Sequence, residues 1–355
     1  MGASEAEGSL WPVSGEAATI ERLLRRWLDE PAGRPLWVRT SGTTGEPKDV
    51  ALSAAAIRAS AVATLARIGG RGQWLLALPA QHVAGLQVLT RSVLAGTSPV
   101  VLADHDGLAA ATVALTGERR YLAAVPTQLQ RWMAAETDLA ALRDFHAVLL
   151  GGAATPCDLV QRARAAGVAV VTTYGMSETC GGCVYDGVAL DGVAIGLGAG
   201  GEISLAGPVL FDGYVDEPHL TAEVLWDGWL HTPDLGRLTG DGRLEVLGRA
   251  DDVVISGGVN VSLPAVENRL TAMPGIEHCA VVGLPDPEWG TWVVAVLVPA
   301  ATGSAPTLEA VRDFVSGVHP RSWAPRGLVV RDSLPLLESG KTDRQSLLGE
   351  LDARR

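Results

Sequence analysis

The sequence has almost no lysine. Of its 28 Lys and Arg residues, only Lys48 and Lys341 are lysines. Because arginine supplies the positive charge elsewhere, a lysine that remains indicates a role that a guanidinium cannot fill. A compact ammonium is a point charge that fits among phosphate oxygens, whereas a guanidinium is planar and bulkier. The alternative, two lysines left by chance, has to place both of them in loops beside glycine, and we favour the functional interpretation.

The chain also lacks a surplus of basic residues and a long apolar run. Its net charge of −12 argues against nucleic acid or an anionic membrane as the main partner, since both are bound through clustered Lys and Arg. No uncharged run reaches the length of a membrane-spanning helix, and the first residues lack the basic-then-apolar order of a signal peptide. Ala6 stands where a myristoylation signal has Ser or Thr. We therefore expect a cytoplasmic protein.

Cysteines are few, and their pattern does not predict a metal or redox site. Cys180 and Cys183 form a C-x-x-C, but a zinc site needs two more ligands at compatible spacing, which Cys157 and Cys279 do not supply. A thioredoxin-like pair opens a helix, whereas the surrounding TCGGCVYDG is rich in glycine and typical of a turn. We interpret these cysteines as small residues packed in the interior.

Between residues 35 and 175, short apolar runs alternate with Ala- and Leu-rich segments of helical spacing, such as Ser53–Ile68 and His82–Leu94. This alternation predicts an α/β fold with a mostly parallel sheet, in which ligands bind at the carboxyl ends of the strands. Turns rich in glycine or hydroxyls follow three of the strands, at Ser41–Gly45, Gly151–Ala153 and Gly175–Glu178. They can converge on one site.

The remaining sequence changes character twice. Residues 188–248 contain short strands and frequent Gly and Asp turns, which predict a β-rich subdomain. Residues 250–355 have the strands and helices of a small α+β domain. At 355 residues the chain is long enough for two domains. We expect an N-terminal domain over 1–249 and a C-terminal domain over 250–355.

The segment TSGTTGEPK (Thr40–Lys48) indicates a phosphate-binding loop, but not the Walker type. A Walker loop needs a second glycine before its lysine, and Pro47 stands there without the N–H that would bind phosphate. Asp49 follows the lysine where a magnesium-binding hydroxyl belongs. A second pattern, G-x-G-x-x-G at residues 196–201, is followed by the apparent strand EISLAG instead of a helix, so we do not read it as a dinucleotide site.

Five segments, in order, resemble the motifs of the adenylate-forming superfamily, which includes acyl-CoA synthetases, nonribosomal-peptide adenylation domains and firefly luciferase. They are TSGTTGEPK (Thr40–Lys48), YGMSE (Tyr174–Glu178), HTPDLG (His231–Gly236), GRADDVVISGGVNVSLPAVE (Gly248–Glu267) and LPLLESGK (Leu334–Lys341). The third departs from the family's T-G-D box, because Pro233 replaces glycine. One such motif is weak evidence, whereas five in order are highly specific.

The resemblance implies a large N-terminal α/β domain, a smaller mobile C-terminal domain, and the substrates ATP and coenzyme A with Mg²⁺. A carboxylic acid is activated as an acyl-adenylate with release of pyrophosphate, and a thiol then displaces AMP. The residues expected to bind ATP are Thr40, Ser41, Gly42, Thr43, Thr44, Gly45 and Lys48 at the phosphates, Gly151, Gly152, Ala153, Tyr174, Gly175 and Ser177 around adenine, and Asp234 and Arg249 at the ribose. Glu178 and Thr43 are the expected magnesium ligands.

The resemblance also assigns catalytic roles. Lys341 would lie between the substrate carboxylate and the α-phosphate, where it offsets the repulsion of two anions. His82 would lie between acyl group and thiol, although a helix-start residue without a catalytic part is an equal alternative. Asp251 would be the hinge about which the C-terminal domain rotates between the half-reactions. That rotation would bring Ser256, Gly257 and Gly258 to line a pantetheine tunnel.

Further local sequence similarity indicates which acid is activated. LPAQHVAGLQVLTRSVLAG (Leu78–Gly96), AVPTQLQR (Ala124–Arg131) and YGMSETCGGCVYDGVALDGV (Tyr174–Val193) resemble the o-succinylbenzoate–CoA ligases of menaquinone biosynthesis. The chain is shorter than most of the superfamily before Trp37, as in compact members of this subgroup. The candidates for contacts to substrate or CoA, including the second carboxylate of 2-succinylbenzoate, are Thr127, Gln128, Ser177, Thr179 and Arg91.

Two other classes stay open. One is another aryl-acid ligase or a stand-alone adenylation enzyme that passes its acyl group to a carrier protein. The other is a catalytically silent nucleotide-binding relative, which the retained Lys341 disfavours. The sequence leaves the oligomeric state open, with a homodimer among the alternatives.

Overall fold

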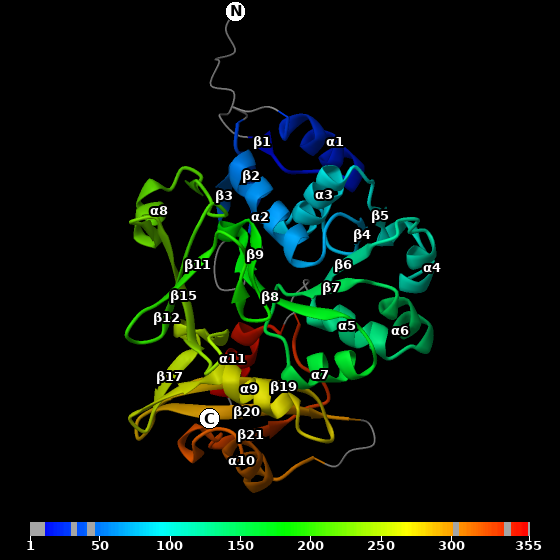
Figure 1. Cartoon of the computed structure of the whole chain (residues 1–355). Helices are drawn as coiled ribbons and strands as arrows, with labels where there is room; N and C mark the ends of the chain where they lie inside the picture. Colours follow the sequence, from blue (N-terminus) through cyan, green and yellow to red (C-terminus); the bar gives the residue numbers. More distant parts are fainter. Residues whose placement is uncertain (1–10, 30–33, 41–46, 301–304, 337–341, 354–355) are drawn as a thin grey trace, which may run out of the picture.

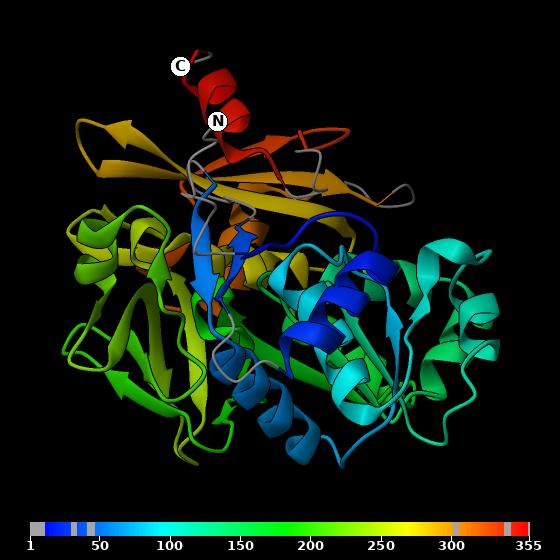
Figure 2. The same cartoon turned by 90° about the horizontal axis from the view of Figure 1, so that it is seen from above.

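A computed structural model describes residues 11–29, 34–40, 47–300, 305–336 and 342–353. Four sheets and their helices make up this structure (Figure 1). The C-terminal part, yellow to red, lies to one side of both the seven-stranded sheet and the β-rich part (Figures 1 and 2). Among the described residues, no helix is both long and apolar enough to cross a bilayer.

The largest sheet has seven strands in the order β10-β9-β8-β7-β6-β4-β5. Its strands are β4 (Gln73–Leu76), β5 (Val100–Val101), β6 (Arg120–Ala124), β7 (Ala147–Leu150), β8 (Val170–Met176), β9 (Gly181–Tyr185) and β10 (Val188–Ala189). The pairs from β5 to β8 are parallel, and β9 and β10 are added antiparallel. The prediction of an α/β fold with a mostly parallel sheet is confirmed.

Alternating strand residues build a core on each face of this sheet. On one face Trp74, Tyr121 and Leu149 pack against the first helices, and on the other Leu75 and Leu122 pack against the later ones. The helices of the first face are α1 (Ala17–Trp27), α2 (Ala54–Arg67) and α3 (Val83–Ala95). Those of the second are α4 (Leu108–Val113), α5 (Pro126–Met133), α6 (Glu136–Arg143) and α7 (Cys157–Ala165).

The expected helices at 53–68 and 82–94 form with clear ends. Ser53 is the N-cap of α2, where its hydroxyl accepts a hydrogen bond from Ala56 N at 3.2 Å. His82 is the N-cap residue of α3, and Gly96 ends that helix in the left-handed conformation at φ 73°. The Ala- and Leu-rich composition therefore gave the correct helices to within about one residue.

One strand does not lie in the sheet that the alternation predicts for it. Residues 36–39 belong to a separate sheet of order β1-β2-β3-β13, formed by β1 (Trp11–Pro12), β2 (Leu36–Arg39), β3 (Asp49–Leu52) and β13 (Gly213–Tyr214). β2 and β3 are antiparallel, with Arg39 opposite Asp49. Only residues 40–48 separate these two strands in sequence, fewer than the dozen or so that a parallel crossover needs, so the strands pair antiparallel.

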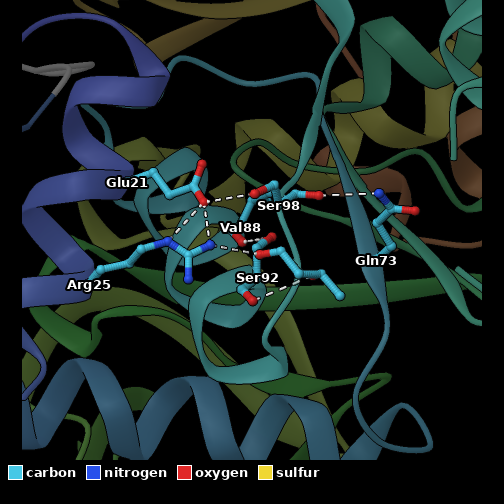
Figure 3. A network of polar contacts seen from close by, with 7 residues as sticks. Glu21, Arg25, Gln73, Val88, Ser92 and Ser98 are labelled. Carbon is cyan, nitrogen blue, oxygen red and sulfur yellow. Dashed lines mark hydrogen bonds and ion pairs between the residues drawn. The ribbon is translucent and has the colours of Figure 1, made fainter. Parts of the chain in front are cut away.

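A polar network ties α1 to the loop before β5 (Figure 3). Arg25 Nη2 donates to Glu21 Oε1 at 2.6 Å and to the Thr97 carbonyl at 3.2 Å, and Ser98 Oγ donates to the same Glu21 oxygen. Gln73 at the start of β4 donates to the Ser98 carbonyl. The N-terminal helix is therefore attached to the edge of the seven-stranded sheet by polar contacts as well as by its buried side chains Ile20, Leu24 and Trp27.

The β-rich part forms a five-stranded antiparallel sheet. It contains β11 (Ala194–Leu197), β12 (Glu202–Ala206), β14 (Leu225–Trp226), β15 (Trp229–Leu238) and β16 (Leu244–Arg249), and α8 (Pro218–Val224) lies beside it. The G-x-G-x-x-G of residues 196–201 joins β11 and β12 as an antiparallel hairpin. The prediction that a strand, and not a helix, follows this pattern is confirmed.

The C-terminal part is a five-stranded sheet with a helical layer on each face. Its elements are η3 (Ala250–Asp252), β17 (Val253–Ser256), β18 (Val259–Ser262), α9 (Leu263–Thr271), β19 (Ile276–Asp286), β20 (Gly290–Pro299), α10 (Leu308–Ser316), β21 (Gly327–Val330) and α11 (Arg344–Asp352). Val281 and Ala295 face α9 and α10, whereas Ala280 and Val296 face α11. The expected boundary at 249/250 falls between β16 and η3, and a division into two moving domains stays a prediction.

Candidate active site

One half of the site is a hydrogen-bonded pair between two sheets. Tyr174 near the end of β8 donates its hydroxyl proton to Asp234 Oδ2 on β15 at 2.8 Å. Burial is the largest cause that raises the pKa of Asp234, and the hydrogen bond from Tyr174 and the charge of Arg249 act in the opposite direction. Burial likewise raises the pKa of Tyr174. The phenol therefore stays neutral and remains a donor to the carboxylate.

Pro233, which departs from the family's T-G-D box, lies at a bulge in the sheet. Between Glu202 and Ser204 the register of β12 against β15 shifts, so that His231 to Leu235 lie opposite this shorter stretch. Proline has no N–H for the ladder, which is why it occurs at bulges and edges. Asp234 N instead donates to Thr232 Oγ1 at 3.1 Å, and Asp234 lies opposite Arg249 on β16. The two expected ribose ligands are thus neighbours.

The other half of the site joins a carboxylate, a phenol and an ammonium. Tyr214 on β13 donates its hydroxyl proton to Glu178 Oε1 at 2.7 Å. Lys48 Nζ lies 5.0 Å from the centroid of the Tyr214 ring, within the range of a cation–π contact. Glu178, the expected magnesium ligand, and Lys48, the expected phosphate contact, therefore touch the same tyrosine. Sequence reasoning did not single out that residue.

The glycine-rich turns lie at the carboxyl ends of β7 and β8, as expected for parallel strands. A side chain at Gly151 would collide with Thr173 Oγ1, and one at Gly175 would collide with the Gly181 carbonyl. Gly152 has φ 76° and is exposed, as is Ala153 beside it. Close backbone approach explains the first two glycines, and the left-handed conformation explains the third.

Thr40 and His82 lie near the start of the phosphate loop. Lys48 N donates to Thr40 Oγ1 at 2.9 Å, and Thr40 N donates to the Lys48 carbonyl at 2.8 Å, so the two ends of the loop are bonded. His82 Nδ1 lies 3.4 Å from the carbonyl oxygen of Arg39, the residue before Thr40. His82 is thus both a helix-start residue and a neighbour of the loop, and its catalytic role stays a prediction.

The candidates for the second carboxylate of the acid differ in accessibility. Thr179 is fully buried, and its hydroxyl is bonded to Met176 and Gly181. Gln128 spans its loop, because its side chain accepts from Val125 N and donates to the Ala77 carbonyl. Arg91 is 3% exposed and lies over the Trp74 ring. Each of these three side chains has a hydrogen-bond partner within the protein, and their part in binding stays a prediction.

Thr127 and Ser177 remain accessible. Thr127 is exposed on the first turn of α5, and Ser177 is half-buried at the end of β8. Their part in binding stays a prediction.

The expected tunnel residues lie at the tip of the β17–β18 hairpin. Ser256 is 1% exposed, and Arg326 Nε donates to its hydroxyl at 3.4 Å. Gly257 and Gly258 have φ 60° and 76° and are exposed. Their distance from the nucleotide residues is set by the orientation of the C-terminal part, so the tunnel stays a prediction.

Several predicted residues cannot be placed. Asp251 lies in η3, and nothing is described of its side chain. The predicted residues that lie outside the described ranges are Ser41, Gly42, Thr43, Thr44, Gly45 and Lys341. The described residues place Thr40, Lys48, Glu178, Tyr174, Asp234 and Arg249 in two connected clusters.

The cysteine interpretation agrees with the structure. Cys180 and Cys183 are buried free thiols, and burial raises the pKa of Cys183 to about 12. Cys180 takes φ 52° at the turn into β9. Among the described residues, no group of three or more His, Cys, Asp or Glu side chains is arranged to hold a metal ion.

Comparison with known proteins supports the same chemistry. A family model described as AMP-binding enzyme matches residues 37–196, and one described as AMP-binding enzyme C-terminal domain matches residues 265–341. A probable 2-succinylbenzoate–CoA ligase from Mycobacterium tuberculosis H37Rv is 47% identical over 330 residues, which cover 89% of this chain and 85% of that protein. A feruloyl-CoA synthase from an Amycolatopsis species is 34% identical, over 88% of this chain and 70% of that protein.

A similar solved structure is the o-succinylbenzoate CoA synthetase from Bacillus subtilis. Its complex with the acyl-adenylate intermediate OSB-AMP has a TM-score of 0.75 and 28% sequence identity, over 88% of this chain and 68% of that chain. The same protein in complex with ATP and magnesium ion has a TM-score of 0.74 and 28% identity, over 88% and 69%. This chain belongs to the AMP-binding enzyme family, the adenylate-forming superfamily.

Proposed function

We propose that the protein is an AMP-forming acid–CoA ligase that converts 2-succinylbenzoate, ATP and coenzyme A into the acyl-CoA thioester, AMP and pyrophosphate, as a step of menaquinone biosynthesis. The observation that carries the proposal is the 47% identity to the mycobacterial ligase over most of both chains. The arrangement of the two clusters supports it, because Asp234 and Glu178 are each held by a tyrosine and would contact the ribose and the magnesium ion.

The first half-reaction forms an acyl-adenylate. An oxygen of the substrate carboxylate attacks the α-phosphorus of ATP, the bond to the bridging β-phosphate oxygen breaks, and pyrophosphate leaves. Asp234 would accept hydrogen bonds from ribose hydroxyls, and Tyr174 holds that carboxylate in place at 2.8 Å. Lys48 and the loop after Thr40 would hold the leaving phosphates, and Lys341 would offset the charge that develops at the reacting oxygens.

The residues present fit a magnesium ion brought in with ATP. Magnesium in nucleotide enzymes is bound by one or two carboxylates together with phosphate oxygens. Glu178 is a half-buried carboxylate, and Tyr214 holds its Oε1. When bound, Mg²⁺ would neutralise phosphate charge during the displacement.

The second half-reaction transfers the acyl group. The CoA thiolate attacks the acyl carbon, the bond from that carbon to the adenylate oxygen breaks, and AMP leaves. We propose that the C-terminal part, residues 250–355, rotates about Asp251 between the two half-reactions and brings Ser256, Gly257 and Gly258 to the thiol. The proposed location is the cytoplasm, because the reaction consumes ATP and CoA. A homodimer is an additional proposal that light scattering can test.

The test is a ligase assay with the purified full chain. With ATP, Mg²⁺, CoA and 2-succinylbenzoate, we expect AMP and the thioester to appear in equal amounts by liquid chromatography, and neither without the acid. Ferulate, indoleacetate and benzoate are the comparison acids, because relatives of this chain act on the first two by name. Turnover of one of these acids without turnover of 2-succinylbenzoate would replace the proposed substrate by another aryl acid.

A further inference from the structure

Among the described residues, Tyr214 contacts both Glu178 and Lys48, and it lies in none of the five sequence motifs. Its hydroxyl is 2.7 Å from Glu178 Oε1, and its ring centroid is 5.0 Å from Lys48 Nζ. The chain has only four tyrosines. Two of these four, Tyr174 and Tyr214, donate to carboxylates of the site.

The backbone around Tyr214 holds the ring in this position. β13 pairs with β3, so that Tyr214 lies opposite Val50, two residues after Lys48. Val215 N donates to the Asp49 carbonyl at 2.8 Å, which fixes the strand next to the end of the phosphate loop. One side of Tyr214 is therefore attached to the segment that carries Lys48.

The other side is attached to the segment that carries Glu178. Phe211 N donates to the Glu178 carbonyl at 2.9 Å, and the Phe211 ring packs edge-on against Tyr214 with centroids 5.0 Å apart. Burial is the largest cause that raises the pKa of the Tyr214 phenol, and the Glu178 charge raises it further. At 2.7 Å from Glu178 Oε1 the hydroxyl is the donor, because an ionised carboxylate can only accept a hydrogen bond.

We propose that Tyr214 is a positioning residue for the metal–nucleotide complex, which rests on the proposed function. Its hydroxyl fixes the Glu178 carboxylate through Oε1 and so presents the other oxygen, Oε2, to Mg²⁺, while its ring supports the ammonium of Lys48 at the phosphates. Partners that orient a ligating carboxylate typically change metal affinity by about 10- to 100-fold when they are removed. Backbone hydrogen bonds already fix the chain on both sides of Tyr214. Its ring can therefore orient the carboxylate with little additional loss of conformational entropy.

The test is Tyr214→Phe, which removes the hydroxyl and keeps the ring. The matched control is Tyr185→Phe, because the Tyr185 hydroxyl is bonded to Thr64 Oγ1 in the core at 2.9 Å and contacts no site carboxylate. The first readout is Mn²⁺ binding with a non-hydrolysable ATP analogue, measured by electron paramagnetic resonance. The second is the Mg²⁺ concentration that gives half-maximal ATP–pyrophosphate exchange with 2-succinylbenzoate.

We expect Tyr214→Phe to weaken Mn²⁺ binding and to raise the half-maximal Mg²⁺ concentration by about tenfold, with the KM for the acid unchanged. Tyr185→Phe should leave both metal readouts at their wild-type values. Unchanged metal readouts in Tyr214→Phe would overturn the inference, and tighter metal binding would overturn it too, since the hydroxyl would then compete with the metal. Absence of exchange in the wild type would contradict the proposed function instead, and Mn²⁺ binding would still decide the role of Tyr214.

Discussion

The hydrogen bond from Tyr174 to Asp234 should contribute measurably to stability, and its contribution should depend on pH. Tyr174→Phe removes only the hydroxyl that lies 2.8 Å from Asp234 Oδ2. A hydrogen bond to a charged group contributes about 1.5–3 kcal/mol, and both partners here are partly exposed, so we expect a loss of about 1.5 kcal/mol at neutral pH. For 355 residues this corresponds to a fall in Tm of about 2 °C.

The sign of the pH dependence follows from the pKa of Asp234. Burial raises that pKa in the folded protein, so ionisation of Asp234 lowers stability as pH rises from the unfolded value of about 3.9 through the folded value. The hydrogen bond from Tyr174 opposes this rise. Without it the folded pKa goes higher, and the variant loses more stability over the same window. The difference in the free energy of unfolding between Tyr174→Phe and the wild type should be small near pH 4 and largest near pH 8.

The assay is urea unfolding followed by tryptophan fluorescence at about pH 5 and about pH 8. A double-mutant cycle with Asp234→Asn isolates the pair, and we expect a coupling of about 1–2 kcal/mol at the higher pH. Tyr185→Phe is the control, because its partner Thr64 does not ionise and its loss should be the same at both pH values. A coupling below about 0.3 kcal/mol, or equal losses of Tyr174→Phe at both pH values, would refute the reasoning.

Three further predictions follow from other parts of the structure. Glu267→Gln should lower the free energy of unfolding by about 2 kcal/mol in urea denaturation, because Arg344 Nη2 donates to both Glu267 oxygens at 2.8 Å and would lose a half-buried charged partner; an unchanged midpoint would contradict this. Arg91→Met should leave stability equal or about 1 kcal/mol higher in the same assay, because Arg91 is buried without a carboxylate partner among the described residues; a large loss would show that the guanidinium contributes net stability. Lys341→Ala should reduce adenylation by about 10²- to 10³-fold while thioester formation from preformed acyl-adenylate stays near wild type; equal loss of both would contradict the proposed rotation.

The sequence was informative where structure is local. The run before Gly151 and the segment at 53–68 formed the expected strand and helix, because a short continuous apolar run and an N-cap serine act within a few positions. The resemblance also directed attention to Tyr174, and that residue bonds to Asp234 in the structure. A motif can do this because it names residue types at fixed spacing.

The sequence did not predict contacts whose two residues are brought together only by the tertiary structure. Tyr214 lies in FDGYVDEP, which has the composition of an ordinary turn. Only tertiary contacts bring it to its partners: the pairing of β13 with β3 places it beside the Lys48 segment, and the bond from Phe211 N to the Glu178 carbonyl places it beside Glu178. The signal that could have found it is the scarcity of tyrosine, the same argument that singled out Lys48. The sequence also does not show that the polar side chains of Thr179 and Gln128 are hydrogen-bonded to backbone groups, and their part in binding stays a prediction.

The two site clusters draw their residues from three different sheets. Lys48 and Tyr214 belong to the small N-terminal sheet or its edge, Tyr174 lies in the seven-stranded sheet with Glu178 just beyond it, and Asp234 lies in the β-rich sheet. Contacts between residues so far apart in sequence form late in folding. The chain must first lose the entropy of closing a long loop, and only then does the contact stabilise it. The site should therefore be among the last regions to assemble during folding, and bound nucleotide would hold three sheets together, so that it acts as a clamp on the whole N-terminal part of the molecule.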